Sequence, residues 1–330
     1  MRIAYLIHSL EVNSCRYRVL QYLPYLKKNG VEVSIHFYKR GWLEKIIFYN
    51  TLGQYDILYI HRKLFPPLEF WYIRKKVKKI VYDFDDALMY RSSSSKSSYS
   101  FSRRYKFSYM MKRADFIIAG NQFLKSEVLH YNPNVTIIPT SIDLSHYPLK
   151  DNWHQKGPIT IGWLGSGSTL KYLKAIMPVL ENLYQRYPHF QLKIICDQFL
   201  EGMRLPVIKK LWAEEEESSD LRSVDIGIMP LSDDLWSRGK CGLKILQYQS
   251  VGLPVVCAPV GVNRDIVENG VNGFWAENET QWEDRLLKLI EGEALRREMG
   301  LRGRMTVEQS YSLEVNGPRI LSVLKKVCHS

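Results

Sequence analysis

The chain has 330 residues, of which 45% are hydrophobic and 24% charged. This composition suits two globular domains and excludes a disordered or fibrous chain, and no apolar run approaches the ~18 residues of a membrane-spanning segment. The net charge of +12 is uneven, because residues 1–150 contain 24 Lys and Arg against 11 Asp and Glu, whereas residues 151–330 contain 22 against 23. The first half is therefore expected to meet an anionic partner, such as a membrane surface, a phosphorylated lipid or nucleic acid; a merely solvated basic surface is the alternative.

The five cysteines are scattered and show no C-x-x-C spacing, which favours small buried side chains over disulfides or metal ligands. Residues 2–8 predict a strand rather than a signal peptide, because the apolar core is short and no small-residue cleavage site follows. A cytoplasmic protein is the expectation. The basic first half extends this to peripheral binding on the inner face of a membrane.

The first half alternates strands with helices. Strands are predicted at residues 2–8, 31–38, 55–60, 80–83 and 114–119, and helices at 15–28, 68–79, from about 102, and from 122 to 130. This alternation is typical of a doubly wound parallel sheet. No G-x-G-x-x-G follows the first strand, so a dinucleotide site is not supported.

Charged residues gather where these strands end, which is where such a sheet binds its ligands. His61 and Arg62 follow the third strand, and the fourth ends in Asp83, Asp85 and Asp86. We expect one of Asp85 and Asp86 to bind an acceptor hydroxyl or a cation. Two arginines at the front of the first helix, Arg16 and Arg18, can hold an anion; the alternative is that they are simply solvated. For His61, the alternative is a hydrogen-bonded structural histidine.

The second half begins after a linker at residues 144–157. Strands are predicted at residues 159–164, 190–196, 225–231 and 253–258, with a helix at 243–250. The strand at 159–164 runs into a small polar loop before a helix, an arrangement that favours phosphate; the loop residues are Gly165, Ser166, Gly167, Ser168 and Thr169. Residues 212–221 read as an acidic, solvated helix start.

The stretch from 224 to 261 is a βαβ unit with a basic loop at its centre. Arg238 and Lys240 lie in the loop, and Lys244 lies in the first turn of the helix that follows. Positive charge at the carboxyl end of a parallel strand favours a phosphate ligand.

The pattern K-x-L-x-Y-x-x-x-G-L-P-V-V from Lys244, followed by P-V-G and E-N-G-x-N-G, resembles the nucleotide-sugar half of GT-B glycosyltransferases, and most closely glycosyltransferase family 4. The resemblance implies an α/β chain with two Rossmann-like, doubly wound domains that face each other across a cleft. It implies an acceptor-binding domain at residues 1–148, a nucleotide-sugar domain at 149–310, and a final helix at about 311–330 that packs back on the first domain.

The same resemblance implies a hexosyltransferase-type enzyme that moves a sugar from a nucleotide diphosphate to a glycan or lipid-linked acceptor, with retention. No metal and no other cofactor is implied, and a D-x-D-type metal site at Asp83–Asp85 is the disfavoured alternative. UDP- or GDP-sugars are the expected donors, a membrane surface is an expected partner, and nucleic acid is not. A non-catalytic nucleotide-sugar or glycan-binding protein on the same fold is the alternative function.

The family's E-x7-E signature aligns its glutamates with Gly239 and Gln247, so neither carboxylate is present. Ribose binding then falls to Gln247, and Trp212 is expected against the base. The predicted catalytic residues are Arg238, Lys240, Lys244, Asp85 and Asp86. The predicted donor-binding residues are Gly165, Ser166, Gly167, Ser168, Thr169, Trp212, Gly239, Cys241 and Gln247, and the predicted acceptor-binding residues are Arg16, Arg18, His61, Arg62 and Asp83.

Overall fold

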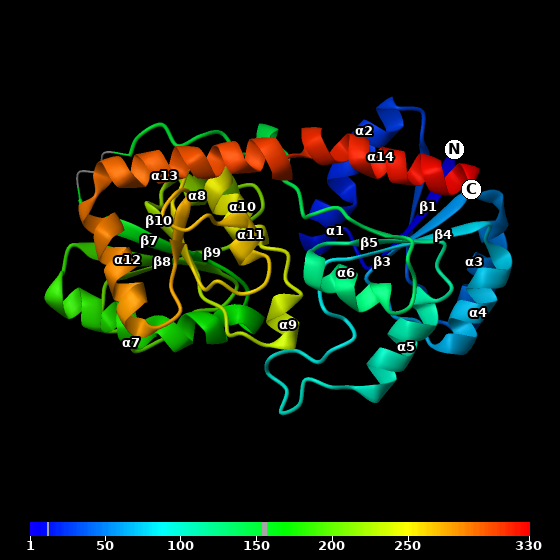
Figure 1. Ribbon diagram of the computed structural model, residues 1–330, viewed down its shortest axis with the longest axis horizontal. Helices are drawn as coiled ribbons and strands as arrows, with labels where there is room; N and C mark the ends of the chain where they lie inside the picture. The colour runs from blue at the N-terminus through cyan, green and yellow to red at the C-terminus, as the bar shows by residue number, and fades with distance from the viewer. Residues whose placement is uncertain (12, 154–156) are drawn as a thin grey trace. The chain divides into compact units, whose positions relative to one another are not determined.

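The computed structural model describes residues 1–11, 13–153 and 157–330 (Figure 1). The chain divides into two compact units. Unit 1 contains Met1–Ser141, Asp234–Cys241 and Leu313–Ser330, and unit 2 contains Ile142–Asp233 and Gly242–Ser312. The predicted linker at 144–157 includes residues 154–156, which lie outside the described residues. Among the described residues, no helix combines the length and apolar character that crossing a bilayer requires.

Unit 1 is built on a parallel sheet of six strands in the order β2-β1-β3-β4-β5-β6. The strands are β1 (Arg2–Ile7), β2 (Glu32–Phe37), β3 (Ile57–His61), β4 (Lys79–Phe84), β5 (Phe116–Ala119) and β6 (Val135–Ile137). The central strands are buried on both faces, which explains why they read as continuous apolar runs in the sequence.

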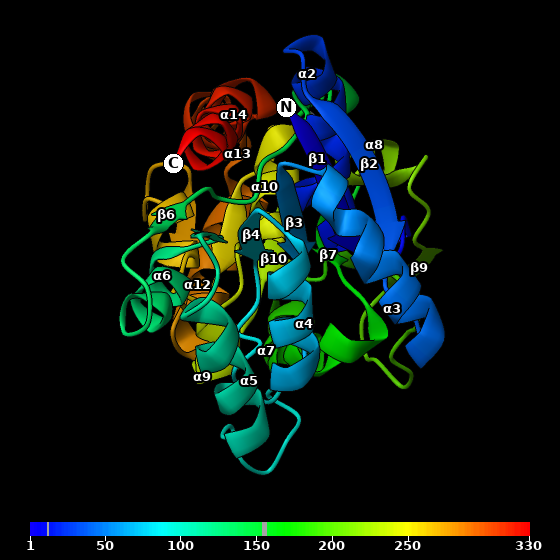
Figure 2. The ribbon, with the colours of Figure 1, turned by 90° about the vertical axis from the view of Figure 1, so that its right-hand side faces the viewer.

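Alternate residues of these strands enter two separate cores. Ala4 and Leu6 face a core covered by α3 (Trp42–Thr51), α4 (Pro67–Lys76), α5 (Phe101–Met111) and α6 (Gln122–Leu129). Tyr5 and Ile7 face the core under α1 (Asn13–Arg18), α2 (Leu23–Lys28) and the final helix α14 (Leu313–His329). The apolar face of α14 thus closes the first sheet, beside α2 in both views (Figures 1 and 2).

Two helices of unit 1 differ from the prediction. The single helix expected at residues 15–28 is broken into α1, a 3-10 turn at Leu20–Tyr22, and α2, because Pro24 in the first turn of α2 cannot donate a backbone hydrogen bond to a continuing helix. Helix α3 was not predicted. Its apolar residues are spread around the helix, and several of them remain exposed, so no clean periodic pattern marks it.

Unit 2 contains a second parallel sheet, ordered β12-β11-β10-β7-β8-β9. Its strands are β7 (Ile159–Leu164), β8 (Phe190–Cys196), β9 (Val207–Leu211), β10 (Ile226–Met229), β11 (Val255–Cys257) and β12 (Gly273–Trp275). Helices α7 (Leu170–Arg186), α12 (Glu279–Glu291) and α13 (Glu293–Thr306) bury their apolar faces on one side, and α10 (Leu243–Ser250) packs against β10 and β11. The prediction of two doubly wound α/β units is confirmed.

The acidic stretch of unit 2 corrects a second expectation. Residues 212–221 were expected to be a solvated helix start, but helix α8 covers only Glu217–Arg222 and Glu217 is buried. Its carboxylate accepts hydrogen bonds from Trp212 Nε1 at 2.8 Å and from the Tyr147 hydroxyl. Asp220 is also buried and pairs with Lys193 at 2.7 Å. These carboxylates tie α8 to the rest of unit 2 because each has a buried donor to satisfy it.

Candidate functional site

The second sheet reverses its strand order between β7 and β10. The chain leaves β7 towards β8 and β9, then returns to β10 on the opposite side of β7. Open parallel sheets bind ligands beyond the carboxyl ends of the two strands at such a reversal. The predicted loop Gly165–Thr169 follows β7 at this place.

The loop and helix α10 meet through Lys244. Its ammonium lies 3.3 Å from Thr169 Oγ1 and 4.7 Å from the centre of the Trp163 ring. Gly165 lets the loop pass over that buried ring, since a Cβ at this position would lie 2.0 Å from it. The structure therefore places a cation beside the Thr169 hydroxyl of the predicted loop, and the indole face supports the cation.

Four backbone amides of the loop already have partners within unit 2. The amides of Gly165, Ser166 and Thr169 donate to Ile195 O, Thr169 Oγ1 and Ser166 O. Gly167 N donates to Asp197 Oδ1 at 2.7 Å, which lowers the pKa of this exposed carboxyl. An anion at this loop would depend on Lys244 and the Ser and Thr hydroxyls rather than on these amides. Sequence reasoning did not find Asp197, although it directly follows strand β8.

The other predicted donor residues of unit 2 lie deeper. Gln247 is buried in α10, and Trp212 is half-buried with its ring nitrogen on Glu217. Tyr248, one residue after Gln247, was not predicted. Its hydroxyl accepts a 2.7 Å hydrogen bond from Leu164 N and donates one of 3.4 Å to Ile228 O, so it ties β7 to β10 at the strand reversal.

In unit 1, four of the predicted residues form one ion-pair network. Arg62 pairs with Asp85 at 3.3 Å and with Asp86 at 2.5 Å, and Asp86 also lies 3.5 Å from Lys240 Nζ. Arg62 is the one non-glycine residue with positive φ (60°) in the described parts of the chain. Strained backbone of this kind is found preferentially at functional sites, and here it aims the guanidinium at two carboxylates.

The segment Asp234–Cys241 is held in unit 1 by its backbone. Asn121 Nδ2 donates to Lys240 O at 2.9 Å and to Arg238 O at 3.3 Å, and Cys241 Sγ donates to Asp85 O at 3.3 Å. Gly239 lies so close to Ala87 that a Cβ there would be 2.5 Å from the alanine methyl. The position that aligns with the first family glutamate therefore has no room for a side chain.

Three predicted acceptor residues are buried. Arg18 donates to Asp83 and to Ile138 O, and neither side chain of the Arg18–Asp83 pair is more than 2% exposed. Burial raises the pKa of Asp83, and the Arg18 guanidinium opposes that shift. His61 is fully buried with Nδ1 3.5 Å from Cys15 Sγ, and burial, with Arg62 and Arg18 nearby, lowers its pKa well below the usual value. These side chains serve the core of unit 1, whereas Arg16 is partly exposed and lies against the Tyr17 ring.

The described residues hold no group of three His, Cys, Asp or Glu side chains arranged to bind a metal ion. The two carboxylates of the D-x-D string, Asp83 and Asp85, are paired with Arg18 and Arg62, and Asp86 is paired with Arg62 and Lys240. The carboxylates of unit 1 that could bind a metal ion are thus already paired with the protein's own cations.

Comparison with known proteins agrees with this architecture. Residues 160–292, which include both the Gly165–Thr169 loop and Lys244, match the family model described as glycosyl transferases group 1. A search of curated protein sequences found no significant match. The predicted resemblance to group 1 GT-B enzymes is confirmed for this part of the chain.

The fold of the whole chain is shared with solved structures at low sequence identity. Sucrose-phosphate synthase from Thermosynechococcus elongatus matches with a TM-score of 0.79 and 12% identity over 98% of each chain. HepE from Anabaena, solved with UDP and glucose, matches with a TM-score of 0.75 and 15% identity over 98% of this chain and 99% of that one. TarM from S. aureus matches with a TM-score of 0.65 and 15% identity over 84% of this chain and 57% of the TarM chain. The chain has the GT-B fold.

Proposed function

We propose, from the GT-B fold and the group 1 match over residues 160–292, that this chain is a glycosyltransferase that moves a hexose from a nucleotide diphosphate to a glycan or lipid-linked acceptor. Unit 2 binds the nucleotide sugar, UDP- or GDP-linked, and unit 1 binds the acceptor. The protein works in the cytoplasm, and transfer proceeds with retention of the anomeric configuration, without a metal or other cofactor.

The observation that carries this proposal is the contact between Lys244 and Thr169 at the strand reversal of unit 2. Negative charge develops on the departing diphosphate as the glycosidic bond breaks. A fixed ammonium beside hydroxyl donors stabilises that charge more in the transition state than in the bound substrate. HepE, which shares the fold, was solved with UDP-glucose, and this supports a UDP-sugar as the first donor to test.

The remaining donor contacts follow from the chain's own residues. From the sequence pattern alone, we propose positive charge from Arg238 and Lys240 and backbone contacts from Gly239 and Cys241 as further contributions to donor binding. Gln247 hydrogen-bonds the ribose, and Trp212 contacts the base.

The acceptor site uses the ion network of unit 1. Arg62 holds Asp85 and Asp86 in place. An acceptor hydroxyl then binds to one of these carboxylates in place of the arginine. Metal-free transfer is supported by this arrangement, because both carboxylates already have cationic partners.

The test is a thermal-shift and transfer series with UDP- and GDP-sugars. A bound donor at 100 times its Kd stabilises the protein by about 2.7 kcal/mol. Lys244→Ala is expected to abolish most of this shift and to lower kcat by roughly 10²–10³, the usual effect of removing one charge-stabilising donor. Lys288→Ala, in the exposed Lys288–Asp284 pair of unit 2, is the matched control and should leave both unchanged. Equal behaviour of the two variants would contradict the proposal.

Binding without transfer is the second candidate function, and the close approach of Gly239 to Ala87 favours it. No carboxylate can occupy the place where the family carries its first glutamate. A donor-induced thermal shift with neither transfer nor donor hydrolysis would establish this alternative.

A further inference from the structure

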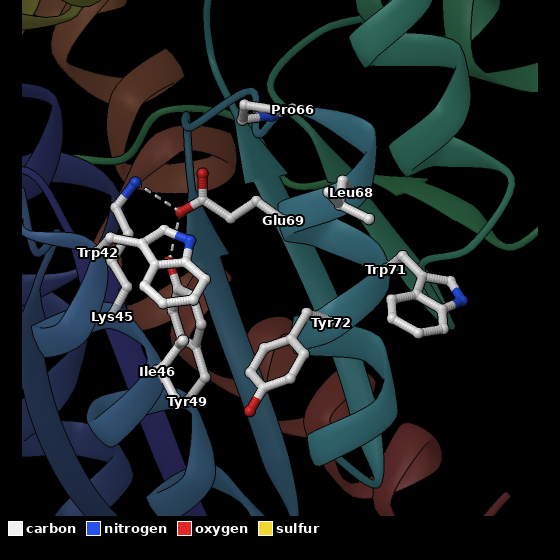
Figure 3. A pocket seen from close by; sticks show the side chains of 9 residues that line it. All are labelled: Trp42, Lys45, Ile46, Tyr49, Pro66, Leu68, Glu69, Trp71 and Tyr72. Atoms are coloured by element: carbon white, nitrogen blue, oxygen red, sulfur yellow. Dashed lines mark hydrogen bonds and ion pairs between the residues drawn. The ribbon is translucent and has the colours of Figure 1, made fainter.

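Helices α3 and α4 of unit 1 enclose an apolar pocket of about 510 Å³ (Figure 3). The two helices lie side by side on the same face of the first sheet (Figure 2). Trp42, Ile46 and Tyr49 line the pocket from α3, and Leu68 and Tyr72 line it from α4. None of these residues belongs to the proposed donor or acceptor site.

The two charged residues of the pocket satisfy each other. Lys45 Nζ lies 3.0 Å from Glu69 Oε1, and the Tyr49 hydroxyl donates to the same oxygen at 2.6 Å. Figure 3 shows these groups joined at one end of the pocket. The rest of the wall is apolar, so the pocket suits a hydrocarbon chain rather than an anion or a sugar.

The outer face around the pocket is unusually apolar for a surface. Trp42 is 78% exposed and Leu68 is 77% exposed, and Leu43, Ile47 and Trp71 are exposed beside them. A contiguous group of large apolar side chains in contact with water indicates a surface that is covered in the working protein.

Basic side chains surround this apolar face. Lys75 lies 5.4 Å from the Trp71 ring centre and Lys76 lies 5.2 Å from that of Tyr72. Helices α3 and α4 together carry four Lys and Arg against two Glu. Exposed tryptophan and leucine flanked by lysine match the boundary between lipid headgroups and acyl chains, where the rings enter and the ammonium groups reach phosphate.

We propose that the outer face of α3 and α4 docks on an anionic lipid bilayer, with Trp42 and Leu68 entering the headgroup layer and one acyl chain filling the pocket. The charge surplus of the same helices selects the bilayer over an apolar protein partner, since lysine is depleted from the centres of protein interfaces. The docking face draws on the proposed function only in expecting an acceptor held at a membrane, and vesicle binding is measured without any sugar donor.

The test is sedimentation of the full chain with vesicles of phosphatidylcholine alone or with 30% phosphatidylglycerol, while tryptophan emission is recorded. We expect binding to the anionic vesicles only, with a blue shift. Lys75→Ala/Lys76→Ala should weaken binding by about 25-fold, because each basic residue near an anionic surface is worth roughly fivefold. Trp42→Ala/Leu68→Ala should weaken binding by at least about tenfold, because two large apolar side chains no longer enter the bilayer.

Leu211→Ala, at a leucine of unit 2 that is 64% exposed, is the matched control and should bind like the parent. None of these side chains is buried, and unchanged melting temperatures will show that the variants fold. The proposal is overturned if anionic vesicles do not bind, if neutral vesicles bind equally, or if the Trp42 and Leu68 variant binds normally. A concentration-dependent dimer lost in that variant would assign the face to a second copy instead.

Discussion

Replacing Asp83 by asparagine decides whether the Arg18–Asp83 pair belongs to the core or to the acceptor site. Arg18 donates through Nε to Asp83 Oδ2 at 3.2 Å, through a second nitrogen to Oδ1, and through a third to Ile138 O at 2.6 Å. Both side chains are removed from water, so loss of the carboxylate leaves a buried guanidinium without a counter-charge. Breaking a buried pair from one side costs about 3–5 kcal/mol.

The assay is urea unfolding of the parent, Asp83→Asn, Arg18→Met and the double variant. Each single change should lower the free energy of unfolding by about 3–5 kcal/mol, and the double change should cost clearly less than their sum, because no lone charge remains buried. Asp56→Asn, in a partly exposed pair with Lys78, should cost about 1 kcal/mol or less. Additive losses, or an Asp83→Asn variant with native stability and a raised KM for acceptor, would refute the reasoning.

Two further predictions concern unit 1. His61 is buried in its neutral form with a lowered pKa, so the unfolded state binds a proton below pH ~6.5 that the folded state does not, and stability falls as pH falls. Between pH 6.5 and 5.5, His61 lowers the free energy of unfolding by about 1 kcal/mol. His61→Gln should remove this part of the pH dependence measured by urea unfolding, whereas His146→Gln, at an exposed histidine, should not. Gly120→Ala should destabilise the protein by about 1–3 kcal/mol, because its Cβ would lie 2.3 Å from Cys241 Sγ. Adding Cys241→Ala should recover part of that loss, and strictly additive effects on the melting curve would show that the two sites do not touch.

Strands with a largely apolar pattern and helices bounded by glycine were predictable from the sequence. Strand β8 and helix α10 have the bounds that the pattern predicts, and α10 is preceded and followed by Gly242 and Gly252, both with positive φ. Strand β9 was missed because Val207–Leu211 is an edge strand with two lysines and only partial burial, which leaves no apolar run to detect.

The candidate site was predictable where it depended on topology. Loops that follow adjacent parallel strands must lie near each other, and this brought Lys244 to the Gly165–Thr169 loop. The position of Arg18 could not be predicted, because it depends on a contact distant in the sequence. An arginine in the first helix reads as an anion contact, and only the fold shows that it points inward to a carboxylate 65 residues away.

The segment Asp234–Cys241 shows why glycine in a basic loop is ambiguous evidence for a phosphate site. In the sequence, Gly239 and Gly242 stand among Arg238, Lys240 and Lys244, as they would in an anion-binding loop. In the structure, each glycine is required because a Cβ there would clash with a neighbouring residue of the same unit. Gly239 makes room for Ala87 in unit 1, and Gly242 has φ 69° with a would-be Cβ 2.2 Å from Ile266 in unit 2.

One of the passages of the chain from unit 1 to unit 2 lies between Lys240 and Lys244. Lys240 pairs with Asp86 within unit 1, whereas Lys244 lies against the Thr169 hydroxyl and the face of the Trp163 ring in unit 2. To bind an anion, the Lys240 ammonium must first give up its Asp86 partner. Lys244 belongs to unit 2 together with the Gly165–Thr169 loop, and it lies against Thr169 of that loop. Donor binding should therefore depend most strongly on Lys244, and not on the more conspicuous Arg238–Lys240 pair.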